Sequence, residues 1–282
     1  MLKQFLGGFA YLWTWLASGV VFCVMASIHA SGAASLEAAP PVQPAKTNLQ
    51  LYLLMGQSNM AGRGEVGEDD KKPSPLVLMY TLSNAWELAV EPVTRDRKSG
   101  LGVGPGLAFG KAMAAKEPGN AIGLVPCAVG GTPLRRWERG GDLYSNAVHR
   151  AQLAMRDGVL TGVLWHQGES DSGTRASAEG YSRRLAKMIA SLREDLGSPE
   201  LPFVAGQLGE FLYDRGADKT PYAQVLNESL ARIGEISPHT ACASSKGLKH
   251  KGDQVHFDTD SQHELGKRYA EAMAALLLPG RR

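Results

Sequence analysis

QLYLLMGQSNM, residues 50–60, joins a short apolar run to a glycine, a glutamine and a serine. The run has the length of a buried strand, and Gly56 permits the sharp turn that would carry Ser58 beyond the strand's end. A serine in such a place commonly caps a helix. It becomes a nucleophile only if a nearby base takes its proton. The pattern of the other strands and the presence of a base decide between these two roles.

Further apolar runs of strand length alternate with longer segments of helical period, a pattern typical of crossover units on a parallel sheet. Most runs are too apolar to have one face in water, so helices are expected on both sides of the sheet. The predicted strands are residues 50–54, 77–80, 121–126, 162–165, 203–207 and 240–243. The predicted helices are residues 105–116, 142–156, 177–196, 222–236 and 261–277.

Length and composition indicate a single catalytic α/β domain, which is predicted to span residues 48–282. The chain has 282 residues, 44% of them hydrophobic, which is enough to bury a substantial core. Thirty Lys and Arg balance 28 Asp and Glu, and the net charge is +2. Proteins that bind phosphate backbones carry a larger basic excess, so nucleic acid is not an expected partner.

The N-terminus has the pattern of an export signal. Residues 1–33 contain one charged side chain, Lys3, and an apolar run at 5–25 that is followed by small residues. We expect this segment to be cleaved and the mature protein to be secreted or periplasmic. The alternative is a membrane anchor with the folded domain outside the cytoplasm, because a run of about 20 apolar residues can span a bilayer. Residues 34–47, rich in Ala and Pro, are expected to form a flexible leader.

The three cysteines do not predict a disulfide framework. Cys23 lies in the apolar N-terminal run, where the large Phe22 before it disfavours lipid attachment. Cys127 and Cys242 lie far apart in the sequence, in or beside apolar stretches. A chain of this size is stabilised by its core, so we expect both to be buried free thiols. Cys and His show no clustered spacing that would predict a metal site.

Four polar segments lie where the functional groups of a parallel sheet are expected, past the carboxyl ends of its strands. GQSNM (56–60) follows the first predicted strand, AVGGT (128–132) the third and HQGESD (166–171) the fourth, while DQVHFD (253–258) precedes the last helix. The carboxyl ends of parallel strands open on a shared crevice. The four segments are therefore expected to meet around Ser58.

His256 is the expected base for Ser58. It lies in a loop held by the final helix, for which Thr259 and Gln262 have the spacing of a capping box. Asp253 comes three residues before His256, so one short turn can place its carboxylate against Nδ1 and leave Nε2 facing the serine. Glu169 is a second candidate for this acid, or a ligand for a neighbouring amide or a substrate hydroxyl. A structural and a functional role are both open for Asp171, in the same segment.

Acyl transfer also needs donors aimed at the oxyanion that develops in the reaction. Gly130 and Gly131 present backbone N–H groups without side chains, and the Gln167 amide offers two further hydrogens. Gln57, next to the serine, is a further candidate for oxyanion or substrate contacts. An ordinary strand-to-loop turn is the alternative for the glycine pair.

Three more polar or aromatic residues lie in or near these segments. Trp137 and Arg135 follow the glycine pair and offer an aromatic face and a forked donor, which suit sugar rings and hydroxyls. Structural contacts at the rim are the alternative for both. His166, adjacent to Gln167, is expected to be a structural histidine packed near the strand end.

Taken together, the four segments resemble the SGNH hydrolase superfamily. Within it they resemble the sialate O-acetylesterase domain and the acetyl xylan esterases of carbohydrate esterase family six. The order and separation of the segments are familiar, and the resemblance runs from about residue 50 to residue 275. It implies a flavodoxin-like, three-layer α/β/α sandwich with a mostly parallel five-stranded sheet.

The resemblance also implies roles for single residues. Ser58 corresponds to the nucleophile and His256 to the base, while the family leaves the acid open between Asp253 and Glu169. The implied oxyanion donors are the backbone N–H of the serine, a glycine N–H of the GG pair, and Gln167, which stands where the superfamily commonly has Asn.

The implied activity is removal of acetyl groups from carbohydrate through an acetyl-enzyme, with no metal or organic cofactor. An acetylated carbohydrate is then the expected partner, and a membrane is one only if the N-terminal segment stays uncleaved. Two alternatives are a non-catalytic carbohydrate-binding protein on the same fold and an esterase for other small acyl esters.

Overall fold

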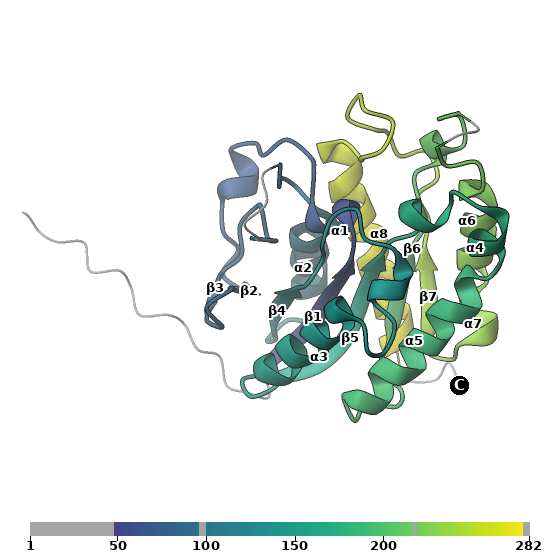
Figure 1. The fold of residues 1–282 in the computed structure, drawn as a ribbon. Helices are drawn as coiled ribbons and strands as arrows, with labels where there is room; N and C mark the ends of the chain where they lie inside the picture. Colours follow the sequence, from purple (N-terminus) through teal and green to yellow (C-terminus); the bar gives the residue numbers. More distant parts are fainter. Residues whose placement is uncertain (1–47, 96–99, 217–218, 279–282) are drawn as a thin grey trace, which may run out of the picture. The chain divides into compact units, whose positions relative to one another are not determined.

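The computed structural model describes residues 48–95, 100–216 and 219–278. These residues form a seven-stranded sheet covered by helices (Figure 1). In spatial order the strands are β3 (Trp86–Leu88), β2 (Val77–Tyr80), β4 (Ala121–Pro126), β1 (Leu49–Gly56), β5 (Val159–His166), β6 (Phe203–Gly206) and β7 (Thr240–Ala243). β2 and β3 are antiparallel, and all other neighbours in the sheet are parallel.

The predicted α/β sandwich is confirmed, but the five strands implied by the family resemblance are too few. All six strands predicted from apolar runs are present. The seventh, β3, is a three-residue edge strand in which Glu87 and Leu88 are exposed. Such a strand has no buried apolar run, so the pattern that finds central strands cannot find it.

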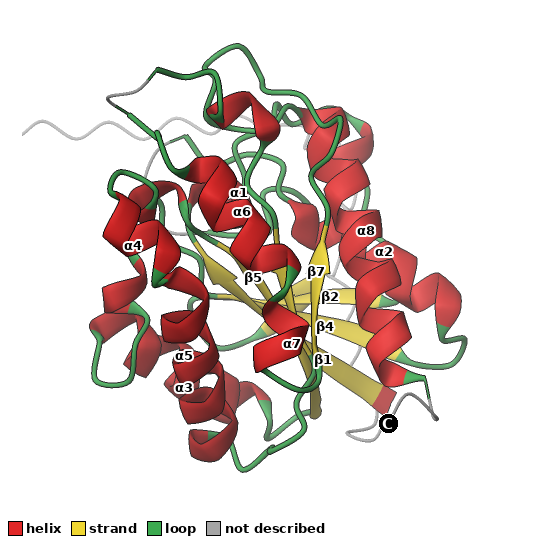
Figure 2. Cartoon of the chain, turned by 90° about the vertical axis from the view of Figure 1, so that its right-hand side faces the viewer, coloured by secondary structure: helices red, strands yellow, loops and turns green. Residues whose placement is uncertain are grey.

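Helices cover both faces of the sheet (Figures 1 and 2). α2 (Pro105–Lys116) and α8 (Thr259–Leu277) pack together on one face. The other face is covered by α3 (Asp142–Ala154), α5 (Tyr181–Asp195), α6 (Ala223–Ala231) and α7 (Ile233–Ile236). Two predicted helices are each divided in two: α4 (Arg175–Glu179) ends at Gly180 before α5 begins, and Arg232 separates α6 from α7.

The cap of the final helix differs from the prediction. Asp258 is the N-cap, and its carboxylate accepts a hydrogen bond from the Ser261 N–H at 2.8 Å. Thr259 instead donates its hydroxyl hydrogen to the carbonyl of Glu65 at 2.8 Å. The start of α8 is therefore held by a carboxylate cap one residue earlier than the capping-box spacing indicates.

Side chains of the central strand alternate between two cores. Leu51, Leu53 and Met55 point into the core beneath α3 and α5, whereas Tyr52 and Leu54 point into the core beneath α2 and α8. All five are buried. Because both faces of β1 are covered, its sequence is a continuous apolar run and not an alternating one.

The predicted export signal, the predicted leader at residues 34–47 and Cys23 lie outside the described residues. Within the described part, no helix is both long and apolar enough to cross a membrane. Cys127 and Cys242 are free thiols, as predicted, but only Cys127 is buried, whereas Cys242 is half-buried at the edge strand β7. Burial raises the pKa of Cys127 to about 11 and that of Cys242 to about 12.

The position of Leu53 predicts a large loss of stability on truncation. Leu53→Ala leaves a cavity in the centre of the sheet, and we expect it to lower the free energy of unfolding by about 2–5 kcal/mol. Leu82→Ala is the matched control, because Leu82 is 61% exposed and its loss should cost less than about 0.5 kcal/mol. Urea denaturation of both variants checks the difference. Equal losses would contradict the described core.

Candidate active site

Ser58 is the first residue of the short helix α1 (Ser58–Ala61), directly past the end of β1. The turn between them requires glycine. Gly56 has a φ of +125°, and a Cβ at this position would lie 2.1 Å from the carbonyl oxygen of His166. Ser58 is 5% exposed, and as the first helical residue it has no partner for its N–H within the helix.

Ser58, His256 and Asp253 form a continuous chain of hydrogen bonds. His256 Nε2 lies 3.0 Å from Ser58 Oγ, and His256 Nδ1 lies 2.7 Å from Asp253 Oδ2. The other oxygen, Asp253 Oδ1, accepts the backbone N–H groups of Val255 at 2.9 Å and His256 at 2.8 Å. One carboxylate thus orients both the imidazole ring and the backbone that carries it.

These hydrogen bonds determine the charge of Asp253. Partial burial alone raises the pKa of its carboxyl, but the bonds from the backbone and ring of His256 and from the Val255 N–H lower it more, to about 2. The carboxylate is therefore ionised near neutral pH. An ionised partner on Nδ1 favours the tautomer whose Nε2 can accept a proton from serine.

A second histidine shapes the turn that carries this pair. His250 Nδ1 accepts the backbone N–H groups of Gly252 at 2.9 Å and Gln254 at 3.2 Å. Gly252 and Gln254 both have left-handed backbone conformations, with φ of 112° and 56°. The side chain of His250, at the start of the turn, thus holds the backbone of the turn in place. Sequence reasoning did not identify this role for His250.

Asn59, also absent from the sequence-based candidates, links the serine turn to the histidine loop. Its Nδ2 donates to the Val255 carbonyl at 3.1 Å and to Glu169 Oε1 at 2.7 Å. Its Oδ1 accepts the Phe257 N–H at 3.1 Å. The buried Asn59 amide therefore binds the backbone on both sides of His256. The only sequence signal for this role is the position of Asn59 next to Ser58.

Glu169 contacts Asn59, while Asp253 contacts His256. One Glu169 oxygen accepts the Asn59 amide, and the other, Oε2, is buried without a hydrogen-bond partner among the described residues. Burial raises the pKa of the Glu169 carboxyl above its ordinary value. Of the two acids that the sequence left open, Asp253 is the one in contact with the histidine ring.

The predicted oxyanion role of Gln167 does not agree with its surroundings. The side chain is fully buried. Its Nε2 lies 2.8 Å from Asp171 Oδ2, 3.0 Å from the Thr132 carbonyl and 3.2 Å from Gln57 Oε1. The amide hydrogens are thus committed to protein acceptors, because the side chain points inward from the strand end and joins three loops.

Gln57 and Asp171 take part in the same buried network. Gln57 is buried, and its Oε1 accepts hydrogen bonds from Gln167 Nε2 and from Ser170 Oγ, both at 3.2 Å. Asp171 Oδ2 accepts the Leu134 N–H at 2.8 Å in addition to the Gln167 amide. Both residues hold loops together, which is the structural role considered for Asp171, while the oxyanion or substrate role of Gln57 stays a prediction.

Trp137 is a core residue, which corrects its interpretation as a sugar platform. It is fully buried, its Nε1 donates to Thr132 Oγ1 at 3.1 Å, and its ring meets that of Trp165 edge-to-face at 5.5 Å. The 3₁₀ turn at Leu134–Arg136 directs Trp137 inward. Arg135, from the same turn, is exposed.

Of the glycine pair, Gly130 lies next to the serine. A Cβ added to Gly130 would lie 3.6 Å from Ser58 Cβ, an ordinary van der Waals distance, and 2.6 Å from Arg63 Nη2, at the end of a flexible side chain. Gly131 is exposed and has a φ of +69°. Arg63, whose guanidinium lies beside Gly130, was not among the residues expected at the site.

His166 is structural, as the sequence predicts. Its Nδ1 lies 3.2 Å from the Tyr269 hydroxyl, and its carbonyl accepts the Gln57 N–H at 2.8 Å. Burial lowers its pKa to about 3, so the ring is neutral. Across the described ranges, no cluster of three or more His, Cys, Asp or Glu side chains is arranged to hold a metal ion.

Known proteins are similar to this chain in sequence and fold. Residues 48–275 match the family described as carbohydrate esterase, sialic acid-specific acetylesterase. A probable carbohydrate esterase of Arabidopsis thaliana is 36% identical over 252 residues, covering 83% of this chain and 93% of that protein.

Solved structures agree with this match. An X-ray structure of an Arabidopsis thaliana protein superposes with a TM-score of 0.72 at 33% identity, over 82% of this chain and 99% of that one. NanS gives a TM-score of 0.67 at 16% identity, over 82% and 98% of the two chains. A carbohydrate acetylesterase from Xanthomonas citri gives 0.60 at 22% identity, over 81% and 56%. At these lower identities the likeness concerns the fold.

The fold and these matches define a carboxylic ester hydrolase. The chain belongs to the carbohydrate esterase family of sialic acid-specific acetylesterases.

The raised pKa of Glu169 predicts a pH dependence of stability. The folded chain retains a proton that the unfolded chain releases above about pH 4.3. The free energy of unfolding should therefore fall as the pH rises from that value toward the folded-state pKa. Glu169→Gln should remove this part of the pH dependence, as measured by urea denaturation over a pH series.

The control is Glu235→Gln, because Glu235 is exposed on α7. The buried carboxyl of Glu91, with its pKa raised to about 8 by burial, contributes the same dependence to both variants and cancels in the comparison. If the Glu169 variant kept the pH dependence of the control, the pKa of the Glu169 carboxyl would not be raised in the folded wild-type chain.

Proposed function

We propose that this enzyme removes O-acetyl groups from carbohydrate through a covalent acetyl-serine intermediate. The observation that carries the proposal is the hydrogen-bonded chain from Ser58 Oγ through His256 to Asp253, at 3.0 and 2.7 Å. It supplies a nucleophile, a base and an orienting carboxylate at the carboxyl end of a parallel sheet. Membership of a carbohydrate esterase family supports the acetyl ester as the substrate group.

In the first half of the reaction, His256 Nε2 takes the serine proton while Ser58 Oγ attacks the acetyl carbonyl carbon. Asp253 stabilises the imidazolium that results. The tetrahedral intermediate then expels the sugar oxygen, which receives the proton from Nε2. The products of this half are the free sugar alcohol and the acetyl-serine.

In the second half, water attacks the acetyl-serine carbonyl, with His256 as the base again. Collapse of the intermediate releases acetate and returns the proton to Ser58. Two backbone N–H groups are suited to the oxyanion: that of Ser58 at the start of α1 and that of Gly130, which lies against the serine. They replace Gln167, whose amide is bonded elsewhere.

Glu169 and Asn59 are positioning residues in this proposal. The Asn59 amide holds the carbonyl of Val255 and the N–H of Phe257, and Glu169 accepts from that amide. The ring between these two backbone contacts is that of His256. The pair therefore fixes the distance between base and nucleophile without touching the reacting atoms.

Acetate release tests the proposed function. The wild-type enzyme should release acetate from acetylated xylan, O-acetylated sialosides or both, and should cleave acetyl faster than octanoyl esters of p-nitrophenol. Ser58→Ala should lower the rate by roughly 10³-fold or more. The control Ser191→Ala, on α5, should retain the wild-type rate. A fluorophosphonate probe should label the wild type and not the Ser58 variant.

Sugar binding without acetate release or labelling would instead indicate a non-catalytic binding protein. Faster cleavage of octanoyl esters would indicate an esterase for other acyl groups.

The choice of acid predicts unequal effects of two isosteric substitutions. Asp253→Asn removes the charge on His256 Nδ1 and should lower kcat by roughly 10³–10⁴-fold. Glu169→Gln keeps an acceptor for Asn59, so it should lower kcat less than tenfold, on the order of one lost hydrogen-bond contribution. Steady-state kinetics on one acetyl ester compares them. A larger loss for the Glu169 variant would make Glu169 the acid.

A further inference from the structure

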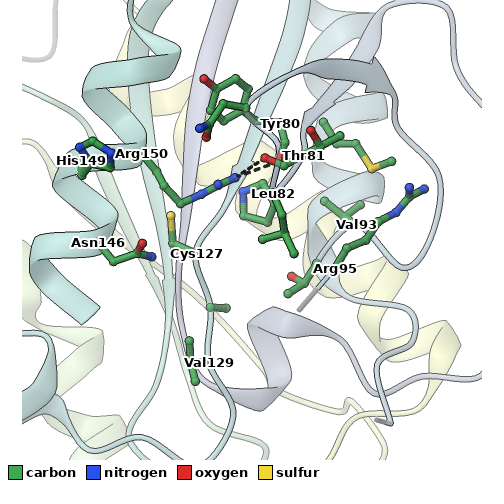
Figure 3. Close-up of a pocket in the computed structure, with 15 residues that line it drawn as sticks. Tyr80, Thr81, Leu82, Val93, Arg95, Cys127, Val129, Asn146, His149 and Arg150 are labelled. Atoms are coloured by element: carbon green, nitrogen blue, oxygen red, sulfur yellow. Dashed lines mark hydrogen bonds between the residues drawn. The ribbon is translucent and has the colours of Figure 1, made fainter. Parts of the chain in front are cut away.

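A cavity of about 320 Å³ lies where β2 and β4 end (Figure 3). Its walls include Thr81, just after β2, and Cys127, just after β4, and α3 contributes Asn146, His149 and Arg150. A volume of this size is at the lower end of the range of small-ligand sites, roughly 300–1,000 Å³. None of the assigned roles in the reaction uses this cavity.

The cavity opens on the same edge of the sheet as Ser58. β2, β4 and β1 are neighbours and parallel, so the residues that follow them share one edge. Val129 lines the cavity and donates its N–H to the Gly56 carbonyl at 2.9 Å, and the next residue, Gly130, lies against the serine. Ser58 and His256 do not line the cavity, so a group held there is remote from the ester.

The walls of the cavity carry positive charge. Arg150 and Arg95 line it, whereas no Asp or Glu is among the described residues that line it. Arg95 forms an ion pair with Glu87 at 3.2 Å, so the charge available to the cavity is that of Arg150. Arg150 is only 7% exposed, and its charge faces the carbonyls of Tyr80 and Thr81, at 3.0 and 3.2 Å from Nη2. The guanidinium carbon also lies 5.3 Å from the centroid of the Tyr80 ring. All these partners are neutral, and a buried cation with neutral partners can hold an anion where a cavity adjoins it.

Arg193 shows how a purely structural arginine is satisfied in this fold. It is also buried, but its Nε and Nη2 both donate to the Leu201 carbonyl, and Nη2 donates to that of His239 as well. Arg150 uses Nη2 alone for its two carbonyl bonds, and its Nε has no partner among the described residues. Arg150 borders a cavity and Arg193 does not border this one.

We infer that this cavity is a carboxylate-binding subsite for a sugar unit next to the one that carries the acetyl ester. The inference rests on the proposed function. The Arg150 guanidinium supplies the charge for the carboxylate. The Asn146 amide offers hydrogen bonds to sugar hydroxyls, and Leu82 and Val93 offer apolar contact to the ring (Figure 3). The enzyme would thus prefer acetylated carbohydrate with an acidic neighbouring unit.

Calorimetry with two matched ligands tests the subsite without any ester. The wild type should bind methyl β-D-glucuronide about tenfold or more tightly than methyl β-D-glucoside, since only the former has a carboxylate for the arginine. Arg150→Gln should abolish the preference. Because Arg150 also holds Tyr80 and Thr81, a second pair of variants at an exposed position keeps the test independent of folding.

That pair is Leu82→Glu and Leu82→Gln, which differ in charge and hardly in shape. Leu82 lines the cavity and is 61% exposed. The Glu variant should bind the glucuronide about fivefold more weakly than the Gln variant at low salt, and the gap should shrink as salt is added. Equal binding of both ligands by the wild type, or equal glucuronide binding by the two Leu82 variants, would overturn the inference.

Hydrolysis of a neutral acetyl ester separates this inference from the proposed function. The wild type should hydrolyse p-nitrophenyl acetate, which carries no sugar, and Ser58→Ala should lower that rate by roughly 10³-fold or more. If hydrolysis depends on Ser58 but glucuronide is not preferred, only the carboxylate subsite is wrong. If no Ser58-dependent hydrolysis occurs, the proposed function itself fails.

Discussion

The backbone pairing of β1 with β4 on one side and β5 on the other is the interaction on which the site depends. It brings the ends of three strands to one edge, so Ser58, Gly130 and the 166–171 loop meet although they are far apart in the chain. The pairing also demands Gly56, because the carbonyl of His166 leaves no space for a side chain there. The serine turn is thus a consequence of how tightly β1 and β5 lie together.

A buried polar network then fixes the loops that the sheet brings together. Gln167 bonds to Thr132, Gln57 and Asp171, and Asn59 joins the serine turn to the histidine loop. Buried amides are costly unless they are paired, so a network whose members bond to one another favours a single loop arrangement. Rigid supporting loops are what a reaction that depends on tenths of an ångström requires.

The sequence allowed the local parts of the site to be predicted and failed where side-chain direction decides. Asp253 and His256 interact within one turn, so their spacing alone predicted the contact. Trp137 and Gln167 were expected to face the substrate, yet both point inward, because the packing of distant elements determines which way they turn. The strands with two buried faces were found for the same local reason, while the exposed edge strand β3 was not.

His256 lies 198 residues after Ser58 in the chain, and this separation has a consequence for biosynthesis. A ribosome that has reached residue 250 has already made Ser58 and most of the sheet, but not the imidazole that would activate the serine. The proposed catalytic contact can therefore form only after His256 has been made and α8 has docked. Until then the Ser58 hydroxyl has no imidazole beside it, so the order of the segments in the chain determines when the two residues can come into contact.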